Sequence, residues 1–177
     1  IEYLRRRDQV REELIRSSRE IIRKCRDAVN KIHRRELKEA REVLAVLEKD
    51  VADMKKSCDG FPDMYYSGIV QEALQEYYET KLLYGYVEVG NIKITDLPES
   101  DYTAFLLGLA DVAGELRREL VQALIDDRIE EAVRYLDHIE EIFNELSRIS
   151  FPDALTPGLR RKVDRIRYIL EASQNDI

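Results

Sequence analysis

Long stretches of this sequence repeat apolar residues every three to four positions, which is the period of an α-helix. In the first 33 residues the repeat runs through Leu14, Ile21, Cys25 and Ile32. Only seven glycines and four prolines interrupt the 177 residues, so the chain has few places at which to turn. The pattern predicts an all-α fold, a single-domain antiparallel helical bundle.

We expect about six helices in one domain that covers residues 1–177. No Gly or Pro separates the first two helices, so a turn is placed near His33, Arg34 and Arg35, with one continuous helix as the alternative. A loop is expected at residues 91–98. The predicted helices span residues 2–33, 36–57, 63–89, 99–124, 128–149 and 157–172.

Two short signals mark helix starts. Ser100 or Asp101 is a suitable N-cap for the fourth helix, because a short polar side chain can accept a hydrogen bond from the first turn. Thr156 and Pro157 together are typical of an N-cap followed by the first helical position. The last helix is therefore expected to begin at Pro157.

Composition excludes several classes of protein. Uncharged runs fall far short of the ~20 residues that cross a bilayer, and no segment has the basic end and apolar centre of an export signal. We therefore expect no membrane partner and a cytoplasmic location. Two cysteines, Cys25 and Cys58, are too few for a disulfide framework, and we assign them no chemistry.

Two pairs of carboxylates stand at helical spacing inside apolar stretches. Glu76 and Glu79 are three residues apart, and Asp111 and Glu115 are four apart, so each pair shares one helix face. Oxygen-only ligation favours Mg²⁺ or Mn²⁺. The alternative is charge that only solvates a helix surface. If the pairs form one metal site, the two acidic faces must converge.

The histidine positions argue against a di-iron site. Di-iron helical bundles use a Glu-x-x-His motif on each of two helices. Neither His33 nor His138 stands at that spacing.

Basic residues are concentrated at the start of the chain. Residues 1–38 contain 13 Lys or Arg against 7 Asp or Glu, an excess of six in a protein whose net charge is −7. Such an excess indicates a phosphate-binding surface, although local pairing with Glu12, Glu20 and Asp27 is the alternative. The arginines on one side of the first helix that we predict to contact nucleic acid are Arg16, Arg19, Arg23, Arg26 and Arg34.

A second basic cluster precedes the C-terminus and serves either RNA or a subunit contact. Its members are Arg160, Arg161, Lys162, Arg165 and Arg167.

Several segments resemble the translin superfamily, specifically translin-associated factor X. They are residues 74–79 (LQEYYE), residues 101–102 (DY) with residues 106–116 (LLGLADVAGEL), the Arg-rich first helix, and the TPG at residues 156–158. The resemblance covers nearly the whole chain. It implies an all-helical fold, assembly into hollow and mostly octameric shells, and action on single-stranded RNA and DNA.

The resemblance also implies specific roles. X-type members are Mg²⁺-dependent endoribonucleases, and their acidic residues correspond to Glu76, Glu79, Asp111 and Glu115. Shorter connections than in eukaryotic members suggest a compact prokaryotic or archaeal relative that assembles with itself.

The leading hypothesis is therefore a Mg²⁺-dependent endoribonuclease for single-stranded or small RNA, in which a metal-activated water attacks the phosphodiester. One alternative is a non-catalytic oligomeric shell that binds single-stranded RNA or DNA. Another is a purely structural helical scaffold, which leaves both charge clusters unexplained. Because the long first helix and the tyrosine-rich third segment present more apolar surface than one bundle covers, we expect a homo-oligomer.

Overall fold

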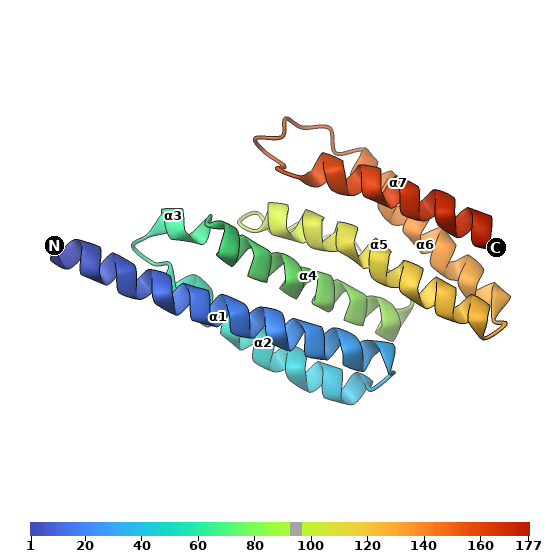
Figure 1. Ribbon diagram of the computed structural model, residues 1–177, viewed down its shortest axis with the longest axis horizontal. Coiled ribbons are helices and arrows are strands. Elements are labelled where there is room, and N and C mark those ends of the chain that lie inside the picture. The colour runs from blue at the N-terminus through green and yellow to red at the C-terminus, as the bar shows by residue number, and fades with distance from the viewer. Residues whose placement is uncertain (93–96) are drawn as a thin grey trace. The chain divides into compact units, whose positions relative to one another are not determined.

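The computed structural model describes residues 1–92 and 97–177. Over these ranges the chain forms seven α-helices and no β-strand, which confirms the all-α prediction. The predicted loop at residues 91–98 lies partly outside the described residues. The helices are α1 (Glu2–His33), α2 (Leu37–Ser57), α3 (Pro62–Tyr65), α4 (Gly68–Val89), α5 (Tyr102–Ile125), α6 (Ile129–Ser147) and α7 (Leu159–Asp176) (Figure 1).

The chain divides into two compact units, Ile1–Tyr84 and Gly85–Ile177, here called unit 1 and unit 2. Unit 1 contains α1, α2, α3 and most of α4. Unit 2 contains the end of α4 and all of α5, α6 and α7. That residues 1–177 behave as one domain stays a prediction.

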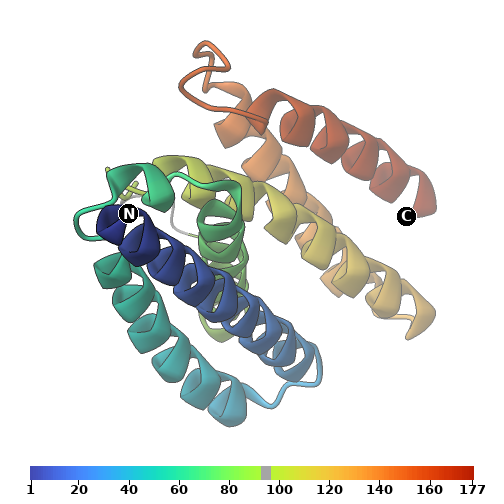
Figure 2. The same cartoon turned by 60° about the vertical axis from the view of Figure 1, so that its left-hand side comes forward.

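In unit 1, α1 and α2 pack against each other in antiparallel directions, with α4 beside them (Figure 2). The apolar stripe of α1 is buried at Leu14, Ile21 and Ile32. Each such aliphatic side chain stabilises the fold by roughly 1.5–3 kcal/mol when fully buried. Two contacts tie α4 to α2: Arg41 Nε donates to Tyr84 Oη at 2.9 Å, and Lys81 Nζ lies 3.6 Å from Glu48 Oε1.

In unit 2, α5 and α6 form an antiparallel pair and α7 packs against both. Leu116 and Leu120 of α5 and Ile139 of α6 are fully buried. Arg117 on α5 also holds the end of α7, because its guanidinium donates to Ser173 Oγ at 3.3 Å and pairs with Asp176. The basic α7 is therefore fixed against α5.

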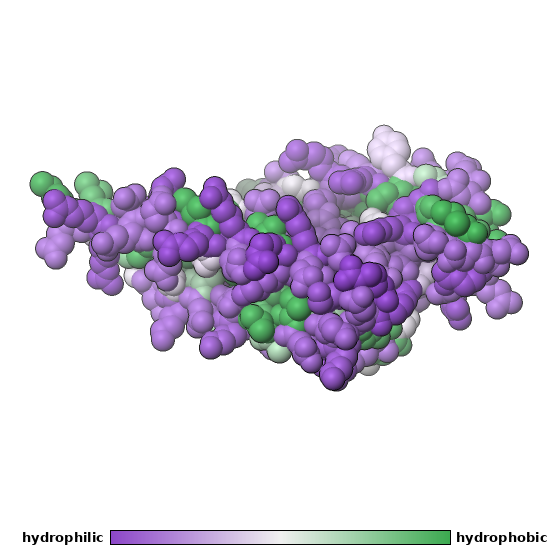
Figure 3. All heavy atoms as spheres, turned by 60° about the horizontal axis from the view of Figure 1, so that its bottom comes forward, coloured by the Kyte–Doolittle hydropathy of each residue, from purple (hydrophilic) through white to green (hydrophobic). Residues whose placement is uncertain are grey.

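The surface is largely hydrophilic on the face drawn in Figure 3, with hydrophobic residues at the free end of α1 and in small patches elsewhere. Among the described residues, no helix combines the length and the apolar character needed to cross a bilayer.

The third predicted helix is interrupted, so the prediction of one helix over residues 63–89 is wrong. α3 ends at Tyr65, and α4 begins at Gly68. Two side chains stabilise the break: Ser67 Oγ donates to the Met64 carbonyl at 2.7 Å, and Gln71 Nε2 donates to the Tyr65 carbonyl at 2.9 Å. The Met64 carbonyl also accepts from Ser67 N–H at 3.1 Å, so the Ser67 hydroxyl adds to a backbone turn bond. The Gln71 amide supplies a side-chain donor to the Tyr65 carbonyl at the same break.

Two predicted helix starts also shift. The last helix begins at Leu159, because Gly158 has a φ of 81° that a helix cannot continue through. The fourth begins at Tyr102 with Asp101 as N-cap residue, although the Asp101 side chain makes no capping hydrogen bond.

The turn at residues 33–36 is confirmed, and one continuous helix is excluded. Arg35 has a φ of 63°. Arg35 N–H donates to the Ile32 carbonyl and Glu36 N–H to the Lys31 carbonyl, at 3.0 and 2.9 Å. This pair of bonds is a Schellman motif, which ends helices with one residue in the left-handed region.

The turn between α5 and α6 has the same design. Asp127 has a φ of 58°, its N–H donates to the Leu124 carbonyl at 3.1 Å, and Arg128 N–H donates to the Ala123 carbonyl at 2.8 Å. Neither turn uses glycine at the left-handed position. Aspartate tolerates that position better than arginine does, because its short polar side chain bonds locally.

Arg35→Gly should raise the free energy of unfolding by about 0.5–1 kcal/mol, because the relieved left-handed strain exceeds the entropy that glycine adds to the unfolded chain. Urea unfolding followed by circular dichroism measures it. Asp127→Gly is the matched control and should gain less. Equal losses in both variants would contradict the argument.

Candidate functional site

The acidic pair of unit 1 lies in the middle of α4. Glu76 and Glu79 are each partly exposed, while Ala73, Tyr77 and Thr80 between and beside them are buried. Thr80 Oγ1 donates to the Glu76 carbonyl at 2.8 Å. The two carboxylates therefore stand at the border of the core and are not part of a fully solvated helix face.

The charges of this acidic pair affect the pKa of Cys25 on α1. Its side chain is fully buried, and burial raises the pKa of its thiol to about 12. A hydrogen bond with Thr80 lowers that pKa, whereas the charges of Glu76 and Glu79 raise it further. The charges of the acidic pair thus act on the α1 side of the unit 1 core, beneath α4.

The acidic pair of unit 2 is more enclosed. Asp111 and Glu115 expose only 19% and 25% of their side chains. Lys162 Nζ on α7 donates to Asp111 Oδ1, and Arg118 Nη1 lies 4.0 Å from Glu115 Oε2. The reading of this pair as a plain solvated surface is therefore wrong for Asp111.

Sequence reasoning placed Lys162 in a basic cluster but missed its pairing with Asp111. The two residues are 51 positions apart, and only the packing of α7 on α5 brings them together. The spacing of neighbouring residues cannot predict a contact between positions so far apart in the chain. Gly114, between the two carboxylates, is exposed and has open space around it, so the chain itself does not use the room that this glycine leaves.

The four carboxylates form two pairs, one in each unit. Glu76 and Glu79 belong to unit 1, and Asp111 and Glu115 to unit 2. Within residues 1–92 and 97–177, no three His, Cys, Asp or Glu side chains form a group able to hold a metal ion. The convergence of the two acidic faces stays a prediction. The donor chemistry nevertheless fits Mg²⁺, which proteins often bind through one or two carboxylates together with waters and substrate phosphates.

The five arginines predicted to contact nucleic acid, four on α1 and Arg34 just after its end, fall into two sets. Arg23 forms two hydrogen bonds to Glu20, at 3.0 and 2.6 Å, and Arg34 forms two to Glu36, at 2.8 and 3.0 Å. These bonds raise the pKa of each arginine. Local pairing therefore accounts for two of the five predicted contacts.

The other three arginines are Arg16, Arg19 and Arg26. All are exposed, and none forms an ion pair or side-chain hydrogen bond within the described part of the chain. Spacings of three and seven residues keep them on one side of α1. They are therefore available to an anionic partner.

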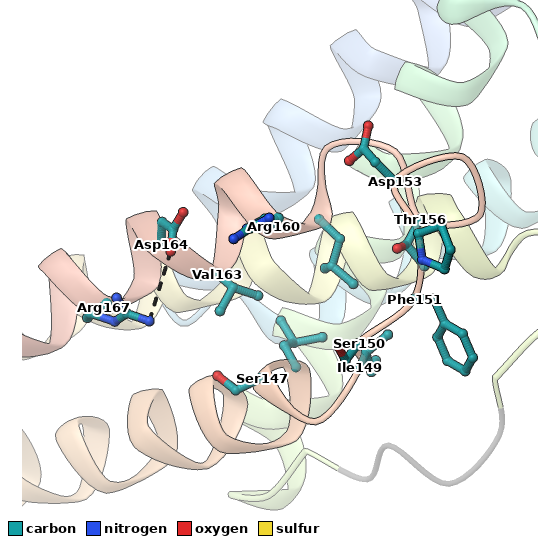
Figure 4. A pocket seen from close by; sticks show the side chains of 13 residues that line it. Ser147, Ile149, Ser150, Phe151, Asp153, Thr156, Arg160, Val163, Asp164 and Arg167 are labelled. Atoms are coloured by element: carbon teal, nitrogen blue, oxygen red, sulfur yellow. Dashed lines mark ion pairs between the residues drawn. The ribbon is translucent and has the colours of Figure 1, made fainter.

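Two pockets flank the start of α7 in unit 2. One, of about 580 Å³, lies between the end of α6, the following loop and α7, and its lining includes Ile149, Phe151, Val163 and Arg167. Figure 4 shows Phe151 extending from the loop on the side away from Arg167, which pairs with Asp164 at 4.0 Å. The other pocket, also about 580 Å³, is lined by Leu107, Asp153, Pro157, Gly158, Arg161, Lys162 and Arg165.

These features define a class of protein: an all-helical chain with two helix-borne carboxylate pairs and an arginine-bearing first helix. A comparison with models of known protein families gives no match. Among curated proteins, the chain is 35% identical over 181 residues to "Uncharacterized protein MJ0175" of Methanocaldococcus jannaschii, covering 100% of this chain and 79% of that protein. The chain belongs to the same family as that protein.

Comparison with solved structures relates the chain to a wider group of proteins. The structure of AfC3PO in complex with duplex RNA and the crystal structure of AfC3PO each match with a TM-score of 0.89 and 29% identity, over 99% of this chain and 91% of theirs. The crystal structure of apo-NeC3PO matches with a TM-score of 0.87 and 23% identity, which shows the fold alone. The chain is thus a relative within the translin superfamily, which confirms the resemblance seen in its sequence.

The buried thiol gives a pH test of the unit 1 site. Because the folded state keeps the Cys25 proton up to a pKa of about 12 whereas an exposed thiol loses it near 9.0, stability should be unaffected below pH 9. It should fall as pH rises above 9, by at most about 1.4 kcal/mol per pH unit.

Urea unfolding of the parent and of Cys25→Ala between pH 7 and 10.5 checks this. Cys25→Ala should be less stable at pH 7 but should lose less stability between pH 9 and 10.5. Identical pH profiles would contradict the burial of a protonated thiol.

Proposed function

We propose that this protein is a Mg²⁺-dependent endoribonuclease that acts on single-stranded or small RNA, with Mn²⁺ as the alternative ion. The observation that carries the proposal is the likeness to AfC3PO over 99% of the chain, because one AfC3PO structure is a complex with duplex RNA. The carboxylate pairs and the unpaired arginines of α1 supply the two chemical functions that RNA cleavage needs.

RNA binding falls to the basic surface of α1. Arg16, Arg19 and Arg26 offer guanidinium groups to phosphate oxygens, which they contact in a bidentate manner. Phosphate contacts fix the position of a strand without reading its sequence. We therefore expect the protein to bind RNA with little sequence preference and to bind single-stranded DNA as a second ligand.

Catalysis falls to Glu76, Glu79, Asp111 and Glu115, whose oxygens would hold the ion. When bound, Mg²⁺ supplies a water of lowered pKa as nucleophile and neutralises charge that develops on the phosphodiester. The partial burial of Asp111 and Glu115 strengthens their attraction for a cation, because water screens them less.

The rival function is a non-catalytic oligomeric shell that binds single-stranded RNA or DNA. One observation favours it: the Lys162 ammonium already compensates Asp111, as a structural ion pair would. In that case the carboxylates serve the fold and the arginines alone serve function.

We also propose that the chain forms a homo-oligomer, with an octamer-like shell as the arrangement implied by the family. The first buried residue of α1 is Leu14, so the helix starts with more than three turns that contribute little to the core of its own chain. Ile1, Tyr3 and Leu4 at its start are 90%, 62% and 64% exposed. Exposed apolar side chains of this kind are typical of surfaces that contact another chain.

Neutralising any one catalytic carboxylate should separate cleavage from binding. Glu76→Gln, Glu79→Gln, Asp111→Asn and Glu115→Gln should each reduce Mg²⁺-dependent cleavage of labelled single-stranded RNA by roughly 100-fold or more. RNA binding should stay equal or become tighter, because negative charge near the phosphate is removed. Gel assays with Mg²⁺, with Mn²⁺ and with chelator measure the first effect, and fluorescence anisotropy measures the second.

The controls are Glu42→Gln and Glu140→Gln, exposed carboxylates on α2 and α6 that should cleave like the parent. Glu76→Gln combined with Asp111→Asn tests whether the two pairs act together, since groups of one site give non-additive losses. A parent protein that binds RNA but never cuts it with either ion would establish the rival function.

Substituting unpaired arginines should weaken RNA binding more than substituting paired ones. Arg19→Ala with Arg26→Ala should weaken single-stranded RNA binding by roughly tenfold and reduce the slope of its salt dependence by about 0.7 for each phosphate that the variant no longer holds. The matched control, Arg23→Ala with Arg34→Ala, removes the same charge from arginines that are already paired and should cost less. Equal losses would show that only the overall charge of α1 matters. Unlabelled duplex RNA serves as competitor, to establish which form binds better.

A further inference from the structure

The pocket around the first turns of α7 combines cationic side chains with a fixed frame. Leu107 of α5 and Pro157 and Gly158 of the preceding loop supply its apolar and backbone walls. Gly158 N–H donates to Asp153 Oδ1 at 3.3 Å, which fastens the loop and engages the one carboxylate in the lining. An ideal Cβ at Gly158 would lie 4.0 Å from Leu107 Cδ2, so this part of the loop lies directly on α5.

Three cations line this pocket, and two of them lack a partner. Arg161 and Arg165 are four residues apart on one face of α7, both are exposed, and neither forms an ion pair within the described residues. Lys162 pairs with Asp111. After Asp153 in the lining and Asp111 beside it are counted against the three cations, the pocket keeps a net positive charge.

The third cation connects the pocket to the acidic pair of unit 2. Lys162 lines the pocket and also donates to Asp111. An anion in the pocket can therefore contact the same lysine as a candidate catalytic carboxylate. A phosphodiester carries one negative charge and two free oxygens, which match two guanidinium groups at helical spacing. A volume of about 580 Å³ accommodates a phosphate with its adjoining sugar.

We propose that this pocket is a backbone-phosphate subsite for RNA, in which Arg161 and Arg165 hold one phosphodiester beside the Lys162–Asp111 ion pair. It lies in unit 2, whereas the α1 arginines belong to unit 1. The inference rests on the RNA binding proposed above but not on catalysis. It gives the strand a second anchoring point, located next to a carboxylate that the reaction would use.

The test is Arg161→Gln combined with Arg165→Gln, made in the Glu76→Gln background so that RNA stays intact. Lys162 is left in place so that Asp111 keeps its partner. The control is Arg134→Gln with Arg148→Gln, which removes the same charge from exposed arginines outside the pocket lining in unit 2. Arg148 pairs with Glu145, and Arg134 forms no ion pair within the described residues. Anisotropy titrations use one single-stranded RNA, with and without a 5′-phosphate, at several salt concentrations.

The pocket variant should bind both RNAs roughly tenfold more weakly, with a salt slope reduced by about 0.7, because one phosphate is no longer neutralised. The control should change little. An equal loss in the control, a loss confined to the 5′-phosphorylated RNA, or a changed subunit number by light scattering would overturn the inference, because the cause would then be diffuse charge, a terminal phosphate or a subunit contact.

Failure of this inference differs from failure of the proposed function. If neither the parent nor Glu76→Gln binds RNA, the proposed function and the subsite are both wrong. If both proteins bind RNA and the pocket variant binds equally well, only the subsite is wrong.

Discussion

Charge at the edge of an apolar core is the constraint on which this protein's candidate site depends. A carboxylate that loses part of its hydration must be compensated by a cation, a proton or hydrogen bonds. In unit 2 that compensation is the Lys162 ammonium, which reaches Asp111 from a different helix. In unit 1 the charges of Glu76 and Glu79 act on the buried Cys25 thiol, whose pKa burial already raises. Each pair therefore interacts with a group on another helix of its own unit.

The same constraint separates the basic residues by role. Arg23 and Arg34 are held by neighbours three and two positions away, so their charge is already balanced. Arg16, Arg19 and Arg26 on α1, like Arg161 and Arg165 on α7, have no such balance within the described chain. Exposed ion pairs contribute at most about 1 kcal/mol each. The distinction therefore matters less for stability than for which arginines can meet a phosphate.

The chain reverses direction between two helices by the same kind of turn in both units. Arg35 and Asp127 occupy equivalent left-handed positions in two Schellman turns, and each turn sets a pair of antiparallel helices. These tight connections fix α1 against α2 and α5 against α6. They hold the arginines of α1 and the carboxylates of α5 on helices whose opposite faces are buried, which gives each charged group a defined direction.

The helices, the turn after His33 and the two carboxylate pairs follow from the sequence, because helical period and spacing are local properties. Local patterns failed at the break between α3 and α4, where Ser67 and Gln71 side chains donate to the carbonyls of the preceding turn. They also failed where Gly158 took a left-handed conformation in place of the expected start at Pro157. The sequence also left open which of the predicted RNA-binding arginines pair locally, because Glu12, Glu20 and Asp27 all stand near them in the chain. Only the tertiary structure decided that Lys162 meets Asp111, because a contact across 51 residues depends on how α7 packs on α5 and leaves no periodic trace in the chain.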